Sequence, residues 1–270
     1  MQAARPSAAD LVGALRRAVE DVVVPALAVD LVWSMTVITR HDDLERGTVP
    51  RRPGLDWAGP AEPGAALEAV YLLGAVAGVP VFPPDPRAGP VHALLRLGPP
   101  GRPATLAVSV HEWALEGGRA ATSVLQATVR WLLTTAEQLR AETGYIALDL
   151  ADSWDAASAW ELAVQAPPAH RDVTRTVWGY GWGTLLSARH VEAVGGIDAL
   201  AAVPGADVRA GPDGRVFVRL GADPAGVSPD QITALRTVLT PVLPTGFRRL
   251  EDFLHPAPDP YADPPLPYLL

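Results

Sequence analysis

The chain has 270 residues, 49% hydrophobic and 19% charged, which is enough to bury a full core as one large domain or two small ones. It contains no cysteine and no lysine, which excludes disulfides, thiol catalysis, Schiff-base lysines and the lysine of a P-loop. The formal net charge of −8 comes mainly from the second half, where 17 acids stand against 10 arginines, and it disfavours binding to nucleic acid.

The sequence carries no sign of a membrane or export segment. No apolar run approaches the roughly 20 uncharged residues that span a bilayer. Charged residues interrupt the first 21 positions, where a signal peptide would need a continuous apolar segment. We therefore expect a folded, soluble, cytoplasmic protein with no membrane partner.

The N-terminal segment predicts a helix followed by a strand. Ser7-Ala-Ala-Asp10 has the form of a capping box, and apolar residues follow it at helical spacing until Pro25. Residues 30–39 are rich in β-branched and aromatic side chains and predict a strand, whereas 40–64 reads as a loop.

Three apolar runs follow. Residues 65–78 are apolar enough for a buried helix, although the presence of Gly74 means that a strand is also possible there. The runs 91–97 and 104–110 flank a turn rich in Gly and Pro, which predicts an antiparallel strand pair.

The middle of the chain predicts the longest helix, over 119–143, with Gly144 as its stop signal. A short strand is expected over 145–150. Asp152 can then cap a helix that runs to about residue 164, before two prolines interrupt the chain.

The C-terminal third begins with an aromatic strand over 173–183. Ser187 can cap the next helix, which meets Gly195 and Gly196. The remaining predicted elements are a hairpin of strands 207–209 and 215–220 around Gly211-Pro-Asp-Gly214, a helix opened by the capping box Ser228-Pro-Asp-Gln231, and an extended Pro-rich tail over 255–270.

This order of elements predicts the α+β class, with a largely antiparallel sheet and helices packed on one face. We expect one two-lobed domain over residues 1–254, best defined over 119–254, followed by the Pro-rich tail 255–270. The Pro-rich region 80–103 is the only candidate for a seam between the lobes.

The most specific segment is Val177-Trp-Gly-Tyr-Gly-Trp-Gly183. In a strand, alternation places Trp178, Tyr180 and Trp182 on one face and three glycines on the other. Because glycine in a strand gives up packing, the bare face predicts the close approach of another element or a ligand. The aromatic face is open to two interpretations, packing in the core or contact with a partner.

Candidate chemistry is sparse. No two of the six histidines are spaced as metal ligands, and no nucleophile elbow or G-x-G-x-x-G loop is present, so we expect neither a metal nor a cofactor. Asp149, Asp152 and Asp155 follow a predicted strand and could act as acid and base on a small molecule or carbohydrate. Helix capping explains the same carboxylates without catalysis.

An acidic stretch between residues 137 and 161 has only Arg140 to offset it, and it would steer a basic partner toward this surface. Ordinary solubility charge is the alternative. The candidate partner-binding residues are Glu137, Asp149, Asp152, Trp154, Asp155, Trp160, Glu161, Trp178, Tyr180 and Trp182.

A longer pattern carries a family resemblance. The run from Val177 to Gly196, the Pro-Asp-Gly hairpin and the helix that ends at Leu239-Thr-Pro-Val-Leu-Pro244 resemble the bacterial immunity proteins encoded beside type VI secretion effectors and other polymorphic toxins. The resemblance covers roughly residues 119–250. It implies a non-catalytic cytoplasmic inhibitor of one cognate toxin. An enzyme that uses the three aspartates, or a homo-oligomeric scaffold, remains the alternative.

Overall fold

A computed structural model describes residues 6–29, 31–39, 49–51, 57, 67–76, 91–97, 104–111, 114–115, 121–147 and 172–243. These residues form two compact units, and the boundary in the described chain falls between Arg140 and Ala141. The boundary therefore does not fall in the Pro-rich region 80–103, whose residues 91–96 form a strand that pairs with residues 69–74 within the first unit.

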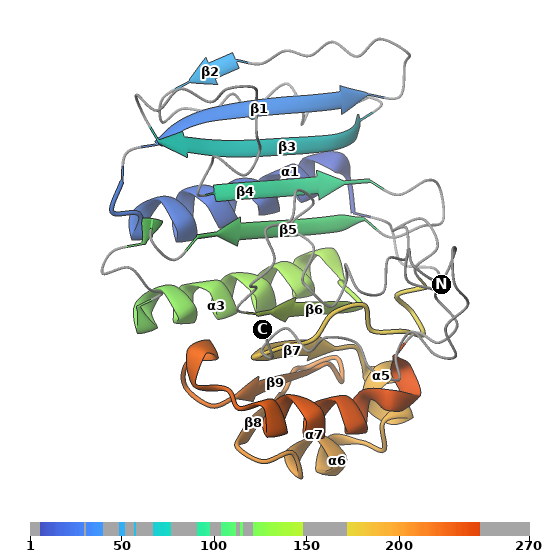
Figure 1. The fold of residues 1–270 in the computed structure, drawn as a ribbon. Coiled ribbons are helices and arrows are strands. Elements are labelled where there is room, and N and C mark those ends of the chain that lie inside the picture. The colour runs from blue at the N-terminus through green and yellow to red at the C-terminus, as the bar shows by residue number, and fades with distance from the viewer. Residues whose placement is uncertain are drawn as a thin grey trace, which may run out of the picture. The chain divides into compact units, whose positions relative to one another are not determined.

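The first unit contains a five-stranded antiparallel sheet (Figure 1). Each strand pairs with its neighbours through a continuous register, apart from one irregularity at Ile38 and Thr39. From one edge to the other the strands are β2 (Val49–Arg51), β1 (Leu31–Thr39), β3 (Leu67–Val76), β4 (Val91–Arg96) and β5 (Thr105–Val110).

The first helical segment of this unit packs on the sheet, and the long helix α3 packs against that segment. Helix α1 (Ala8–Arg17) opens with the predicted capping box, because Ser7 Oγ accepts from the Asp10 N–H and Asp10 accepts from the Ser7 N–H. The helix continues as a π-helix, η1 (Ala18–Val23), and a 3₁₀ turn, η2 (Val24–Ala26). The indole of Trp131 in α3 (Thr122–Leu139) donates to the Ala14 carbonyl at 3.1 Å and ties α3 to α1.

The core of this unit lies between α1 and the sheet. Leu15 and Val19 from the helical segment are at most 1% exposed. They share one cluster with alternate residues of the strands, among them Trp33, Leu72 and Leu95. Alternation along each strand thus directs one set of side chains toward α1.

The prediction of a buried helix over 65–78 is wrong, because residues 67–76 form β3. A continuous apolar run satisfies both a buried helix and a buried strand, so periodicity cannot separate them. Gly74 was the informative residue. A Cβ there would lie 2.8 Å from Leu31 Cδ1 and 3.2 Å from the Trp33 ring, so this glycine admits the side chains of β1.

The second unit contains a four-stranded antiparallel sheet. Its hairpin is the predicted one: the Gly211 N–H donates to the Arg215 carbonyl at 2.7 Å and Gly214 has a φ of 77°. The strands in spatial order are β6 (Thr143–Ile146), β7 (Gly183–Leu186), β9 (Val216–Leu220) and β8 (Ala206–Ala210).

The helices of the second unit are mostly short, and the last one contributes most to the core. Ile232, Leu235 and Leu239 of α7 are fully buried. These helices are α5 (Ala188–Ala193), α6 (Ile197–Ala201), α7 (Pro229–Leu239) and the 3₁₀ turns η7 (Pro224–Gly226) and η8 (Thr240–Val242).

The α+β class with antiparallel strands is confirmed, but the strands form two sheets. The longest helix is shorter than the predicted 119–143. Arg140 adopts the left-handed conformation with φ 54° and ends α3, while Gly144, the expected stop, lies inside β6. In the part of the chain that the structure describes, no helix is long and apolar enough to cross a membrane. The predicted helix 153–164 and tail 255–270 lie outside that part.

The capping box of α7 yields a first prediction. Ser228 Oγ accepts from the Gln231 N–H at 3.2 Å, and Gln231 accepts from the Ser228 N–H at 2.9 Å. Ser228→Ala should lower the free energy of unfolding by about 1 kcal/mol, because a donor of the first turn loses its partner. Chemical denaturation would measure the loss. Thr233→Ala, at an exposed position in the interior of the same helix, is the control, and an equal loss there would contradict the capping role.

Candidate functional site

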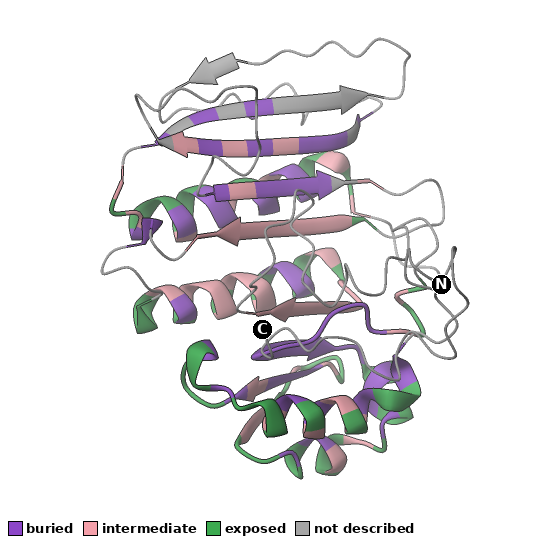
Figure 2. Ribbon diagram, in the orientation of Figure 1, coloured by how far each residue is buried: buried purple, intermediate pink, exposed green. Residues whose placement is uncertain are grey.

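The segment that leads into β7 is buried along its whole length. Every residue from Val177 to Ser187 is buried, as Figure 2 shows for the described chain. Trp178 is 4% exposed, and Tyr180 and Trp182 are each 1% exposed. Of the two interpretations of the aromatic face, the structure supports packing in the core.

The predicted strand over 173–183 is much shorter in the structure, because β7 begins only at Gly183. Thr184 Oγ1 accepts from the Gly181 N–H at 3.1 Å and donates to the Gly181 carbonyl at 3.2 Å. Such local side-chain bonds replace bonds to a neighbouring strand and bend the chain. The Val177 N–H still donates to the Val242 carbonyl, and the Leu220 N–H donates to the Trp182 carbonyl, both at 2.7 Å.

Aromatic rings fill the glycine side of this segment. A Cβ on Gly179 would overlap the Tyr145 ring carbons Cδ1 and Cε1. A Cβ on Gly183 would lie 2.9 Å from Phe217 Cζ. The expectation of a close approach is therefore confirmed, and the approaching groups are side chains of β6 and β9.

The predicted partner-binding residues separate into three groups. Trp178, Tyr180 and Trp182 are corrected from partner contacts to core residues, because side chains with so little exposed area have no surface to offer. Glu137 is exposed on the last turn of α3. The other candidates, Asp149, Asp152, Trp154, Asp155, Trp160 and Glu161, lie outside the described residues.

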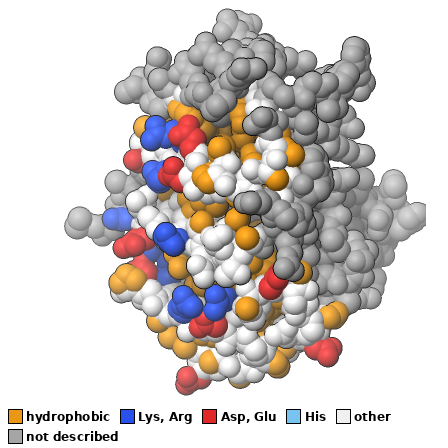
Figure 3. Space-filling view, turned by 90° about the vertical axis from the view of Figure 1, so that its left-hand side faces the viewer, with side chains coloured by type: hydrophobic (Ala, Val, Ile, Leu, Met, Phe, Trp, Pro, Cys, Tyr) orange, Lys and Arg blue, Asp and Glu red, His pale blue; other side chains and the backbone are white. Residues whose placement is uncertain are grey.

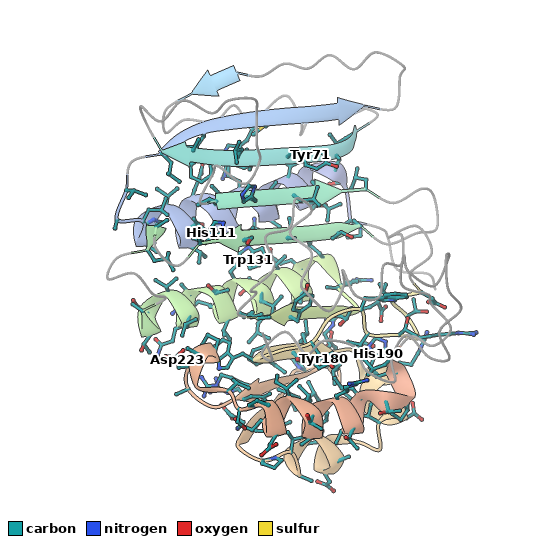
Figure 4. The ribbon with its side chains drawn as sticks, in the orientation of Figure 1. Tyr71, His111, Trp131, Tyr180, His190 and Asp223 are labelled. Atoms are coloured by element: carbon teal, nitrogen blue, oxygen red, sulfur yellow. The ribbon has the colours of Figure 1, made fainter. Side chains whose placement is uncertain are left out.

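A buried polar pair follows the aromatic segment. Ser187 Oγ lies 3.2 Å from Nδ1 of His190, whose side chain is fully buried in the second unit (Figure 4). Among the described residues, Nε2 of His190 has no hydrogen-bond partner at good geometry. Sequence reasoning identified Ser187 as a helix cap but missed His190. The Ser-x-x-His spacing was the available signal, since it joins the cap position to the end of the first helical turn.

Ser187 lies on a pocket of about 240 Å³, lined also by Glu142, Ala188, Arg189, Asp213 and Arg215. Two of the four charged residues that line this pocket pair with each other. Arg215 pairs with Asp213 and donates from Nε to the Ala141 carbonyl at 3.1 Å.

A hydroxyl beside an imidazole is also the geometry of a nucleophile and its base. His190 is not among the residues that line the pocket, and its Ser187 contact joins two residues of one helical turn. Ser187 is the N-cap residue of α5, but its side chain makes no capping hydrogen bond to the backbone. We interpret its contact with His190 as packing that holds the start of α5, where the Val191 N–H donates to the Ser187 carbonyl at 3.0 Å. Among the described residues, no group of three His, Asp or Glu side chains could hold a metal ion.

The comparisons with known proteins identify one fold neighbour. No family model and no curated protein matches the sequence. Among solved structures, the fold is similar to that of the Pseudomonas aeruginosa T6SS protein PA0821, with a TM-score of 0.51 and 16% sequence identity. The match covers 89% of this chain and 70% of that chain, and at this identity it shows a shared fold.

The contact between Gly179 and Tyr145 predicts a strong effect of a single methyl group. Gly179→Ala should lower the free energy of unfolding by about 1–3 kcal/mol, because overpacking displaces the ring and its neighbours. In a Tyr145→Ala background the same change should cost much less. Denaturation of the four proteins gives the coupling energy. Gly226→Ala, where a Cβ meets nothing within 4 Å, is the control. Equal costs in both backgrounds would contradict the packing role.

His190 predicts a pH dependence of stability. Burial lowers the pKa of His190 below its ordinary 6.5, and the Glu142 carboxylate opposes this shift only in part. Below pH 6.5 the unfolded chain therefore binds the proton more readily than the folded one. The free energy of unfolding then decreases as the pH is lowered. His190→Asn should flatten this slope between pH 7 and 5, measured by denaturation at each pH. A slope identical to that of the parent protein would refute the assignment.

Proposed function

We propose that this chain is a non-catalytic cytoplasmic immunity protein that binds and neutralises a cognate toxin associated with type VI secretion. The fold likeness to a T6SS protein over 89% of the chain carries this proposal. The resemblance of residues 119–250 to the immunity proteins of polymorphic toxins supports it from the sequence.

The packing of the second unit is compatible with a protein that acts through its surface. Its most distinctive segment, 177–187, is buried and contributes to the core. The hairpin 206–220 holds its charges in short-range pairs, among them Arg209 and Arg219, each 2.8 Å from Asp207. These side chains support the fold. We therefore expect other residues to bind the toxin.

Charge distribution points to where recognition would lie. The described residues contain 13 acids and 12 arginines, so most of the net charge of −8 resides in the rest of the chain. On the face in Figure 3, basic and acidic side chains of described residues lie beside one another. The acidic stretch 137–161 is the proposed toxin-facing surface, with exposed Glu137 at its start and a basic toxin as its partner.

The first test is whether an adjacent gene encodes a large secreted protein with a toxic C-terminal domain, and the decisive experiment is co-expression with that domain. A stable complex on co-purification, together with growth of cells that otherwise die from the toxin domain, is the expected result. The absence of both binding and protection would overturn the proposal. Turnover of a substrate by the pure protein, lost on neutralising Asp149, Asp152 or Asp155, would favour the enzyme alternative.

Charge reversal tests the proposed surface. Asp152→Arg with Asp155→Arg should lower the association rate with a basic toxin domain at least several-fold at low salt, because steering depends on local charge. The difference should shrink at physiological salt, where screening acts over about 8 Å. The control is Asp198→Arg with Asp230→Arg, which makes the same charge change at exposed positions. Stopped-flow binding that gives equal low-salt rates for both variants would exclude this surface.

A further inference from the structure

The two sheets expose four edge strands, and three of them are protected against pairing with other chains. Strand β2 is three residues long and contains Pro50 and Arg51. Strand β6 has only four residues. Strand β8 carries Asp207 and Arg209. Short length, proline and charge are the means by which natural sheets prevent edge-to-edge association.

Strand β5 has none of these protections. Its six residues, Thr-Leu-Ala-Val-Ser-Val, include no charge and no proline. It forms one end of the five-stranded sheet and pairs only with β4 (Figure 1). All six residues are half-buried. Within the described chain no backbone hydrogen bond reaches β5 from any element other than β4, so among these residues its outer N–H and C=O groups have no backbone partner.

The sequence of β5 is complementary to itself. Leu106, Val108 and Val110 pack against the core of the first unit, whereas Thr105, Ala107 and Ser109 alternate with them and occupy the opposite face. A twofold axis through Ala107 or Val108 would place two antiparallel β5 strands side by side with like faces opposed. Apolar residues would then meet apolar residues, and a shift by one residue would lose this match.

We propose that β5 is a self-association edge, at which two copies of this chain pair their five-stranded sheets into one continuous antiparallel sheet. Because each strand contributes only six residues, the contact is small compared with the roughly 1,200–2,000 Å² of stable interfaces. The dimer is therefore weak and forms as the protein concentration rises. This inference does not depend on the proposed function, since an immunity protein could bind its toxin through another surface.

Sedimentation equilibrium of the full chain over a wide concentration range tests the dimer, and hydrogen exchange locates it. We expect the mean mass to rise toward twice that of the monomer, with the β5 amides that point away from β4 becoming protected in step. A monomer at every concentration would overturn the proposal. Dimers with no change in exchange at the β5 amides that do not bond β4, or protection of those same amides in the dilute monomer, would overturn it as well.

Paired charge variants separate loss of the edge from loss of the fold. Ala107→Lys with Ser109→Lys places like charges across either twofold axis, and so does Ala107→Glu with Ser109→Glu. Each double variant should remain monomeric, whereas an equimolar mixture of the two should recover the dimer. Ala210→Lys on β8 is the control and should dimerise like the parent protein.

Circular dichroism confirms that each variant is folded, and the single change Ala107→Lys replaces any double variant that is not. Dimers that persist unchanged in the folded variants would place the interface elsewhere and refute the assignment. Failure of the mixture of folded, oppositely charged variants to recover dimers would refute it too.

Discussion

The second unit depends on the packing of aromatic rings against bare backbone. Tyr145 occupies the space that a side chain on Gly179 would fill, and Phe217 does the same at Gly183. Because a ring in contact with a peptide plane excludes water from both, this arrangement lets the chain from Val177 to Ser187 lie fully buried. The buried main chain is then satisfied by bonds such as that from the Val177 N–H to the Val242 carbonyl.

This constraint accounts for what the sequence could and could not predict. The alternation of aromatic residues and glycines correctly indicated a close approach, since the cost of glycine in an extended segment demands a compensating contact. It could not say which groups approach, because Tyr145 and Phe217 are distant in sequence and reach these glycines only in the folded unit. The aromatic side chains alternate in sequence, yet each of them is buried. The alternating sequence therefore identified the segment as unusual, but it could not show whether its aromatic side chains lie in the core or at an interface.

Local signals were the most dependable ones. The capping boxes at Ser7 and Ser228 were correct, because each depends on residues three positions apart. The helix expected over 65–78 was wrong, since only cross-strand partners distinguish β3 from a buried helix. The end of α3 was also missed: Arg140 adopts the left-handed conformation that Gly144 was expected to provide. Both errors occurred where tertiary contacts outweigh propensity.

The same division between local and long-range effects bears on function. Side chains that are conspicuous in the sequence, the tryptophans and tyrosine of 177–183, form the core, and the charged pairs around β8 and β9 are nearly balanced. A surface that recognises one macromolecule needs charged side chains that are not already paired within the protein. Each internal ion pair must be broken or desolvated before its members can bind a partner. The excess acids lie outside this framework, so a fold shared at 16% identity is compatible with recognition that differs from one protein to the next.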